Sequence, residues 1–232
     1  MKDVIIALDF KDRKETMEFL KQFPEPIYVK VGMELYYAEG PEIVRLIKNM
    51  GHQVFLDLKF HDIPNTVKGA MRSCLSLDAD MVNLHASGGR EMMEAAMEEV
   101  KKAEHRPLVI AVTILTSMSE AALHDDLHVE GSLEDSVLRL AAMTRESGLQ
   151  GVVCSAWEAR KVKDSLGEDF LTITPGIRPE GKEKGDQVRV VTPAMARDMG
   201  SDFIVVGRPV TAAEDPYATY KSIREDFLGV IS

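Results

Sequence analysis

Short apolar runs alternate with longer amphipathic runs from one end of the chain to the other. The apolar runs are rich in Val and Ile and nearly continuous in hydrophobicity, which is typical of strands buried on both faces. We therefore predict eight strands, over residues 4–10, 28–32, 53–60, 81–86, 107–115, 151–155, 170–176 and 203–208. The amphipathic runs predict helices over residues 13–23, 41–50, 63–77, 90–104, 132–148, 156–166, 192–200 and 215–228.

The regular alternation of strands and helices predicts a parallel sheet. Eight strand–helix units in 232 residues favour a closed (β/α)8 barrel, also called a TIM barrel. An open doubly wound sheet is the alternative, but at this length such a sheet usually has about five or six strands. No stretch has the composition of a linker, so we predict one α/β domain over residues 1–232.

The charge balance restricts the class of partner. With 28 basic and 38 acidic side chains, the net charge is −10, which argues against nucleic acid or an anionic membrane as a partner. No apolar run approaches the ~20 residues that span a bilayer. The two cysteines lie in no metal-ligand spacing, and Asp9 interrupts the apolar start of the chain, so we expect a reduced, cytoplasmic protein. A local basic pocket can still bind an anionic small substrate.

Ionisable side chains interrupt several predicted strands near their carboxyl ends, where barrel enzymes place their catalytic groups. The first strand carries Asp9, the second Lys30 and the third Asp57 and Lys59, with Asp62 just beyond. Asp57 and Lys59 are two residues apart, so on a strand they face the same side. They could form an ion pair that only fills a barrel layer. Because Lys30 and Asp62 add two further charges, we favour an alternating, nearly neutral reactive cluster, to which Asp62 could come from a neighbouring subunit.

A second pattern predicts a phosphate site. Gly207 and Arg208 end the eighth strand, and exposed backbone N–H groups with a guanidinium match the geometry of phosphate. Barrels often bind phosphate at the loops after strands seven and eight. Arg178 and Gln187 flank a polar, Gly-rich loop after the seventh strand, which could close over the same group.

The segment DLKFHDIPNTV, residues 57–67, resembles the signature of the orotidine 5′-phosphate decarboxylase family. The resemblance continues along nearly the whole chain. It includes ALDF around Asp9, KVGMEL around Lys30, VNLHASGG around His85, VTILTSMS around Thr116, TPGIRPEG around Arg178, DQVRVVTP around Gln187 and IVVGRP around Arg208. Members of this family are homodimers of (β/α)8 barrels with active sites at the dimer interface, and they use no cofactor.

The resemblance implies decarboxylation of orotidine 5′-phosphate to uridine 5′-phosphate and CO2, the last step of de novo UMP synthesis. It makes Lys59 the proton donor and puts Asp57 beside the substrate carboxylate. Lys30 and Asp62 complete the charged network, with Asp62 supplied by the partner subunit. The implied substrate-binding residues are Asp9, Lys30, Asp57, Ile63, Thr66, Thr116, Ser119, Pro175, Arg178, Gln187, Gly207 and Arg208. Either Thr116 or Ser119 would be the main pyrimidine contact.

Two other functions are compatible with parts of this pattern. A magnesium-dependent 3-keto-gulonate 6-phosphate decarboxylase or hexulose-phosphate synthase shares the Asp-x-Lys-x-x-Asp motif and the barrel. In that branch an acidic metal ligand stands at the position of Lys30, and a lysine there disfavours a divalent cation. A non-catalytic protein that binds nucleotide phosphates would need the phosphate site but not the four clustered charges.

Overall fold

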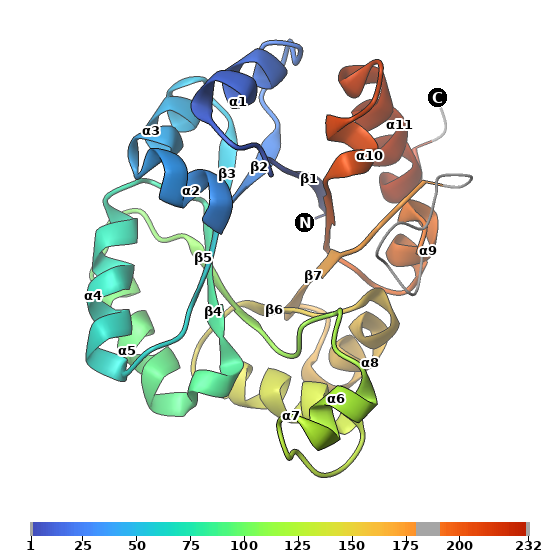
Figure 1. Cartoon of the computed structure of the whole chain (residues 1–232). Helices are drawn as coiled ribbons and strands as arrows, with labels where there is room; N and C mark the ends of the chain where they lie inside the picture. The colour runs from blue at the N-terminus through green and yellow to red at the C-terminus, as the bar shows by residue number, and fades with distance from the viewer. Residues whose placement is uncertain (1, 180–190, 231–232) are drawn as a thin grey trace.

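The computed structural model describes residues 2–179 and 191–230. Within these residues, eight parallel strands close into a barrel in which each strand pairs with its neighbours in sequence and the eighth pairs with the first. Figure 1 looks along the barrel and shows the helices ringed around it. The strands are β1 (Asp3–Ala7), β2 (Tyr28–Gly32), β3 (Gln53–Phe60), β4 (Met81–His85), β5 (Leu108–Val112), β6 (Gly151–Val153), β7 (Leu171–Pro175) and β8 (Phe203–Val206). The predicted (β/α)8 barrel is therefore confirmed.

Each of the eight predicted helices is present in the described residues. They are α1 (Arg13–Leu20), α3 (Glu42–Asn49), α4 (Pro64–Leu75), α5 (Arg90–Val100), α7 (Leu133–Glu146), α8 (Ala156–Leu166), α9 (Pro193–Asp198) and α11 (Pro216–Leu228). Four short helices are additional, and each follows the carboxyl end of a strand. They are α2 (Met33–Glu39), η1 (Ala86–Gly88), α6 (Glu120–Asp125) and α10 (Arg208–Thr211). Helices this short carry too few turns for a periodic apolar pattern, so they could not be predicted from periodicity.

Most strand predictions extend too far at the carboxyl end. β1 ends at Ala7 rather than at residue 10, and β8 ends at Val206 rather than at residue 208. The apolar pattern continues past the point where the backbone leaves the ladder, so hydrophobicity alone does not mark the end of a strand. Asp9 therefore lies beyond its strand, and Gly207 and Arg208 open the short helix α10.

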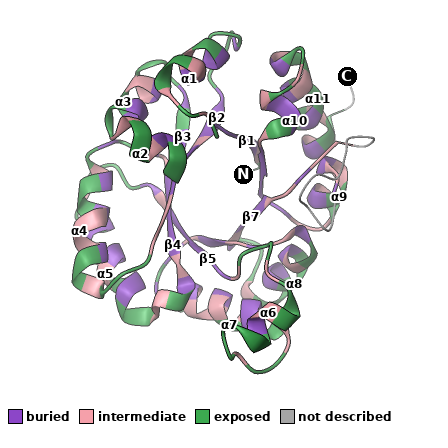
Figure 2. Cartoon of the chain, in the orientation of Figure 1, coloured by how far each residue is buried: buried purple, intermediate pink, exposed green. Residues whose placement is uncertain are grey.

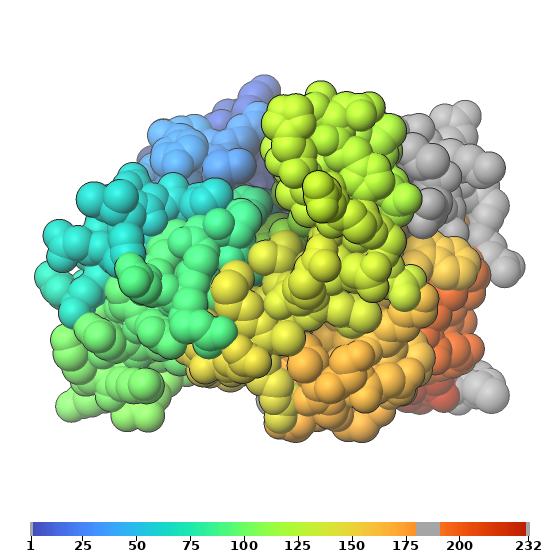
Figure 3. All heavy atoms as spheres, turned by 90° about the horizontal axis from the view of Figure 1, so that it is seen from below, coloured from blue at the N-terminus to red at the C-terminus, as the bar shows by residue number. Residues whose placement is uncertain are grey.

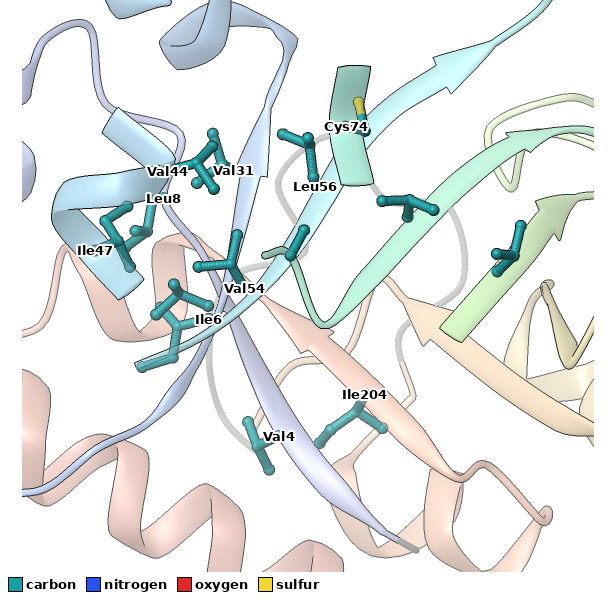
Figure 4. Close-up of a cluster of buried hydrophobic side chains, with 14 of the residues drawn as sticks. Val4, Ile6, Leu8, Val31, Val44, Ile47, Val54, Leu56, Cys74 and Ile204 are labelled. Carbon is teal, nitrogen blue, oxygen red and sulfur yellow. The ribbon is translucent and has the colours of Figure 1, made fainter. Parts of the chain in front are cut away.

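The core has an outer and an inner part. The larger apolar cluster lies between the outward faces of the strands and the surrounding helices, and Figure 4 shows a portion of it that includes Val54, Leu56 and Ile47. Figure 2 shows the strands as mostly buried, while the helices carry their exposed residues on the outside. The strands therefore bury both faces, which explains their nearly continuous hydrophobicity.

A second, smaller cluster, which includes Tyr28, Phe55 and Met81, fills the inside of the barrel. Side chains two residues further along a strand face the same way. On β2, β3 and β4 these next inward positions are occupied by Lys30, Asp57 and Asn83. The barrel interior therefore changes from apolar to polar toward the carboxyl ends of these strands. The period-two pattern thus builds a polar layer on an apolar floor, at the end where barrel enzymes carry their sites.

Candidate active site

Four of the predicted charged side chains meet at this polar layer. The Lys59 ammonium lies 2.7 Å from Oδ1 of Asp57, and the Lys30 ammonium lies 3.3 Å from Oδ2 of the same carboxylate. Lys30 also donates a hydrogen bond to Oδ1 of Asp9 at 3.1 Å. The Asp57 carboxylate is thus held between two ammonium groups, and the side chains of Lys30 and Asp57 are only 12% and 10% exposed. Asp57, Lys59 and Lys30, which we predicted to share one cluster, therefore lie in one chain of contacts, and Asp9 extends it.

The cluster keeps its charges despite its burial. Burial by itself would raise the pKa of Asp57, but the charges of Lys30 and Lys59 and the hydrogen bonds from Lys59 and Asn83 outweigh it, so the pKa is lowered. Burial would lower the pKa of Lys30, but attraction to Asp57 and Asp9 outweighs it, so the pKa is raised. At neutral pH, Asp57 is therefore an anion and Lys30 a cation.

The backbone at Lys59 is unusual. Its φ angle is +51°, in the left-handed region, and the register between β3 and β4 shifts between Leu56 and Phe60. The Lys59 N–H donates a 2.8 Å hydrogen bond to Oδ1 of Asn83, and Nδ2 of Asn83 donates a 2.6 Å hydrogen bond to Oδ1 of Asp57. No role for Asn83 was predicted from the sequence. A polar residue at an inward position of β4, with Val82 and Leu84 on either side, is the signal that could have found it.

Space beside this cluster is kept open by glycine. A Cβ atom on Gly32 would stand 3.0 Å from the Lys30 ammonium nitrogen and 3.4 Å from Oδ1 of Asp9. On Gly207 a Cβ would stand 3.6 Å from the Cβ of Ala7 and 3.8 Å from Oδ2 of Asp9. The Gly32 position is the tighter of the two, so a larger residue there would push Lys30 away from its carboxylate partners.

A cavity of about 200 Å³ connects the charged cluster to the predicted phosphate site. Its lining joins Asp9 and Lys30 from the first two strands to residues from the seventh and eighth. The full lining is Ala7, Asp9, Lys30, Pro175, Gly176, Ile177, Arg178, Val205, Gly207, Arg208 and Pro209. Pro175, Arg178, Gly207 and Arg208 are thereby brought together, as predicted. Gln187 lies outside the described residues. A larger surface hollow of about 450 Å³ is lined by residues 124 and 128–131 and by none of the predicted site residues.

Backbone contacts fix the position of Arg178 at the edge of this cavity. Its N–H donates a 3.0 Å hydrogen bond to the carbonyl oxygen of Val191. The preceding residue, Ile177, forms an isolated parallel bridge with Val191, and both residues are buried. The chain therefore leaves β7 through a short anchored segment before it reaches the residues that the structure does not describe.

The segment after β3 points three predicted residues away from this cluster. Asp62, Ile63 and Thr66 are all exposed, and the Ile63 side chain is 67% exposed although it is apolar. Oδ1 of Asp62 accepts a hydrogen bond from the N–H of Ile63 at 2.6 Å. Within the part of the chain that the structure describes, Asp62 makes no ion pair. This barrel by itself therefore does not join Asp62 to the Asp57–Lys59 pair.

Thr116 and Ser119, the two candidates for a pyrimidine contact, lie between β5 and α6 and are both exposed. In Figure 3 this lime-green segment projects from the rest of the surface. Ser119 caps α6, since its hydroxyl oxygen accepts a hydrogen bond from the Ala122 N–H at 3.1 Å. The Thr116 side chain has no such helix-capping role.

Metal-ligand clusters and membrane-spanning helices are both absent from the described residues. No group of three or more His, Cys, Asp or Glu side chains is placed to hold a metal ion within residues 2–179 and 191–230. None of the helices described is both long and apolar enough to cross a membrane.

A sequence model of the orotidine 5′-phosphate decarboxylase / HUMPS family matches residues 2–223. The chain belongs to this family. One relative, the orotidine 5′-phosphate decarboxylase of Streptococcus mutans, is 55% identical over 227 residues, which cover 97% of this chain and 97% of that protein. The Bacillus cytotoxicus protein of the same name is 51% identical and covers 99% of this chain and 98% of its own. The crystal structure of orotidine 5′-phosphate decarboxylase from Lactobacillus acidophilus matches with a TM-score of 0.88 at 39% identity, over 98% of this chain and 99% of that one.

Family membership agrees with the whole-chain resemblance seen in the sequence. The three residues of the Asp-x-Lys-x-x-Asp motif do not lie together in this barrel. Asp57 and Lys59 face the barrel interior, whereas Asp62 lies on the exposed segment after the strand. Within this barrel the motif therefore pairs its first two groups and leaves its last carboxylate exposed.

Proposed function

We propose that the protein decarboxylates orotidine 5′-phosphate to uridine 5′-phosphate and CO2 without a cofactor, as the last step of de novo UMP synthesis. The observation that carries the proposal is the Lys30–Asp57–Lys59 cluster at the carboxyl ends of β2 and β3. The relatives named orotidine 5′-phosphate decarboxylase, at 51–55% identity over nearly the full length, support the same substrate.

The chemistry requires a fixed cation. When the bond from C6 of the pyrimidine to its carboxylate breaks, the electron pair stays on C6, which has no adjacent carbonyl or Schiff base to take up the charge. An ammonium group held beside C6 stabilises this carbanion and then delivers a proton to it. We assign this role to Lys59, whose ammonium is already oriented by Asp57. A proton from solvent then restores the lysine.

Coulomb attraction sets the scale of this effect. Two unit charges ~4 Å apart at an effective dielectric of ~20 attract by roughly 4 kcal/mol, or about three decades in rate. Lys59 alone therefore does not account for a very large acceleration. We assign part of the remainder to phosphate binding, which positions the ring against Lys59. Asp57, beside the substrate carboxylate, would add repulsion that is relieved when CO2 leaves.

The position of each remaining predicted residue indicates which part of the substrate it would bind. Among the residues that line the 200 Å³ cavity, Asp9 and Lys30 are suited to ribose hydroxyls, and Arg178, Gly207 and Arg208 are suited to phosphate. Pro175 is a further lining residue. We also assign Gln187 to the phosphate group. Between the two pyrimidine candidates we favour Thr116, because Ser119 already caps α6.

We further propose that the protein is a homodimer in which each site is completed by the partner. The exposed side chains of Asp62, Ile63 and Thr66 support this, since an apolar side chain and a carboxylate without an ion pair among the described residues are suited to an interface. Asp62 would then add its carboxylate to the partner's cluster.

The two cysteines, Cys74 and Cys154, are both buried free thiols, which supports a reducing, cytoplasmic location.

The deciding experiment follows the absorbance of orotidine 5′-phosphate with purified protein in EDTA. We expect the absorbance to fall as substrate is consumed, and we expect uridine 5′-phosphate to accumulate in equal amount. Activity that disappears on chelation and returns with magnesium would instead favour the sugar-phosphate branch of the fold. Tight binding of uridine 5′-phosphate without turnover would identify a binding protein.

Replacing Arg208 tests the phosphate assignment. For Arg208→Met we expect the Kd for uridine 5′-phosphate to rise about 10–100-fold, because a hydrogen bond to a charged group contributes roughly 1.5–3 kcal/mol. The Kd for uridine, which lacks the phosphate, should not change. Isothermal titration measures both, and Arg145→Met, which removes an arginine paired with Asp169 on the surface, is the matched control. Equal losses for nucleotide and nucleoside would place Arg208 elsewhere in the site.

A further inference from the structure

We propose that Asn83 is a positioning residue that fixes both reactive groups of β3, the Asp57 carboxylate and the backbone that carries Lys59. Asn83 lies at the centre of β4 and is 1% exposed. Its carboxamide is buried and hydrogen-bonded to Lys59 and Asp57, so it acts through these neighbours rather than on the substrate. The inference deepens the proposed function, on which its kinetic readout rests.

Both ends of the Asn83 carboxamide are used. The carbonyl oxygen Oδ1 accepts a 2.8 Å hydrogen bond from the Lys59 N–H, and the amide nitrogen Nδ2 donates a 2.6 Å hydrogen bond to Oδ1 of Asp57. The same Asp57 oxygen accepts a 2.7 Å hydrogen bond from the Lys59 ammonium. One planar group therefore ties the start and the end of the Asp57-x-Lys59 unit into a closed ring of contacts.

The Lys59 backbone needs such a partner. At φ +51° it adopts a conformation that residues with a Cβ rarely take, and the shift in register removes its N–H from the regular ladder with β4. A buried N–H without a partner is unfavourable, so the acceptor supplied by Asn83 stabilises this conformation. The left-handed conformation also sets the direction in which the Lys59 side chain leaves the backbone, so that its ammonium reaches Asp57.

Few side chains can replace this carboxamide. An ionised carboxylate of the same shape offers the acceptor but no donor, and it would stand against Asp57 as a like charge. Leucine has the same branching and the same number of side-chain heavy atoms, but it offers neither group. Asn83→Leu therefore removes both hydrogen bonds, whereas Asn83→Asp removes only the donor as long as the new carboxyl group is ionised.

For Asn83→Leu we expect kcat for orotidine 5′-phosphate to fall by about 100-fold, the scale of a misplacement of roughly 1 Å. The Kd for uridine 5′-phosphate should stay within about threefold, because the phosphate residues lie on other strands. A loss of both in parallel, or an unchanged kcat, would overturn the inference. As a control, Thr172→Val removes a hydroxyl hydrogen bond that links β7 to the turn before β8, to the Gly200 carbonyl at 3.1 Å, and should lower Tm but not kcat.

The pH dependence of Asn83→Asp gives a readout that a merely structural role would not move. Burial and the Asp57 charge raise the pKa of the introduced carboxyl group, and below that pKa its O–H can again donate to Asp57. The ratio of variant to wild-type kcat should therefore rise by about tenfold as pH falls from 8 to 5.5. The other ionisable side chains around this position are Lys30 and Lys59, which contact Asp57, and His85 on the same strand, whose ring lies 5.4 Å from that of His61. Because both proteins carry these side chains, the ratio isolates the introduced carboxyl group, and a flat ratio would count against the inference.

A crystal structure of Asn83→Leu, or of Asn83→Ala if the leucine variant does not fold, tests the backbone without any assay, because both substitutions remove the acceptor for the Lys59 N–H. We expect Lys59 to leave the left-handed region and its ammonium to move off Asp57. Lys59 still at a φ near +51° would overturn the inference even with an inactive enzyme. If wild-type protein does not turn over orotidine 5′-phosphate, the proposed function fails, and the Lys59 conformation still decides the role of Asn83.

Discussion

Replacing Lys59 by methionine should lower kcat for orotidine 5′-phosphate by at least about 10⁴-fold. The variant loses a general acid, typically worth 10²–10⁴-fold, together with the fixed charge beside the developing carbanion, worth about 10²–10³-fold. The Asp57 carboxylate keeps Lys30 at 3.3 Å, so the cluster retains one ion pair and the barrel should still fold. Uridine 5′-phosphate should bind within about tenfold of wild type, because its phosphate contacts lie on other strands. Absorbance decay and isothermal titration measure the two quantities.

Lys48 provides a matched control for this substitution. Its ammonium lies 2.7 Å from Oδ2 of Asp80 and its side chain is 18% exposed, close to the 2.7 Å and 26% found for Lys59 with Asp57. Asp80 also accepts a hydrogen bond from the Val54 N–H near the start of β3, so this pair lies toward the opposite end of the barrel. Lys48→Met should lower Tm and leave kcat unchanged. Similar losses of kcat in both variants would mean that Lys59 acts through stability alone.

The charged cluster was predictable because two periodicities coincide in the sequence. Alternation of strands and helices predicts that the carboxyl ends of β1 to β3 meet at one rim, and the two-residue period puts Asp57 and Lys59 on one face. The structure places Lys30 in this chain of contacts, as predicted, and shows that it lies between two carboxylates, those of Asp57 and Asp9. Because an unpaired buried charge is strongly unfavourable, charged residues in apolar strands indicate in the sequence that partners of opposite charge lie nearby.

The conformation of Lys59 could not be predicted in the same way. A left-handed residue that is not glycine carries no local signal, and its partner Asn83 lies 24 positions further along the chain. Neutral side chains are not forced to pair as charges are, so Asn83 was visible only as a polar residue in an apolar strand. The short helices that follow β2, β5 and β8 were missed because their contacts, rather than their periodicity, fix them.

The position of Asp62 could not be predicted from a single chain, because in one barrel its carboxylate lies outside the charged cluster. If the homodimer shares its sites, mixing Asp62→Ala with Lys59→Met should restore activity that neither variant has alone. In the mixed dimer one site receives both defects and the other neither, so a 1:1 mixture with free exchange regains about a quarter of the wild-type activity. The recovery should follow the rate of subunit exchange, measured by pull-down of a tagged variant.

The matched control is a mixture of Asp57→Ala with Lys59→Met. Both residues lie on β3 with 2.7 Å between their charged groups, so each barrel supplies its own pair. Every site in that mixed dimer carries one defect, and no recovery is expected. Recovery in the first mixture and none in the second would require Asp62 to cross from the partner. If demonstrated exchange leaves both mixtures inactive, the exposed carboxylate of Asp62 serves its own barrel instead, and a movement of the segment after β3 would be needed to bring it to Lys59.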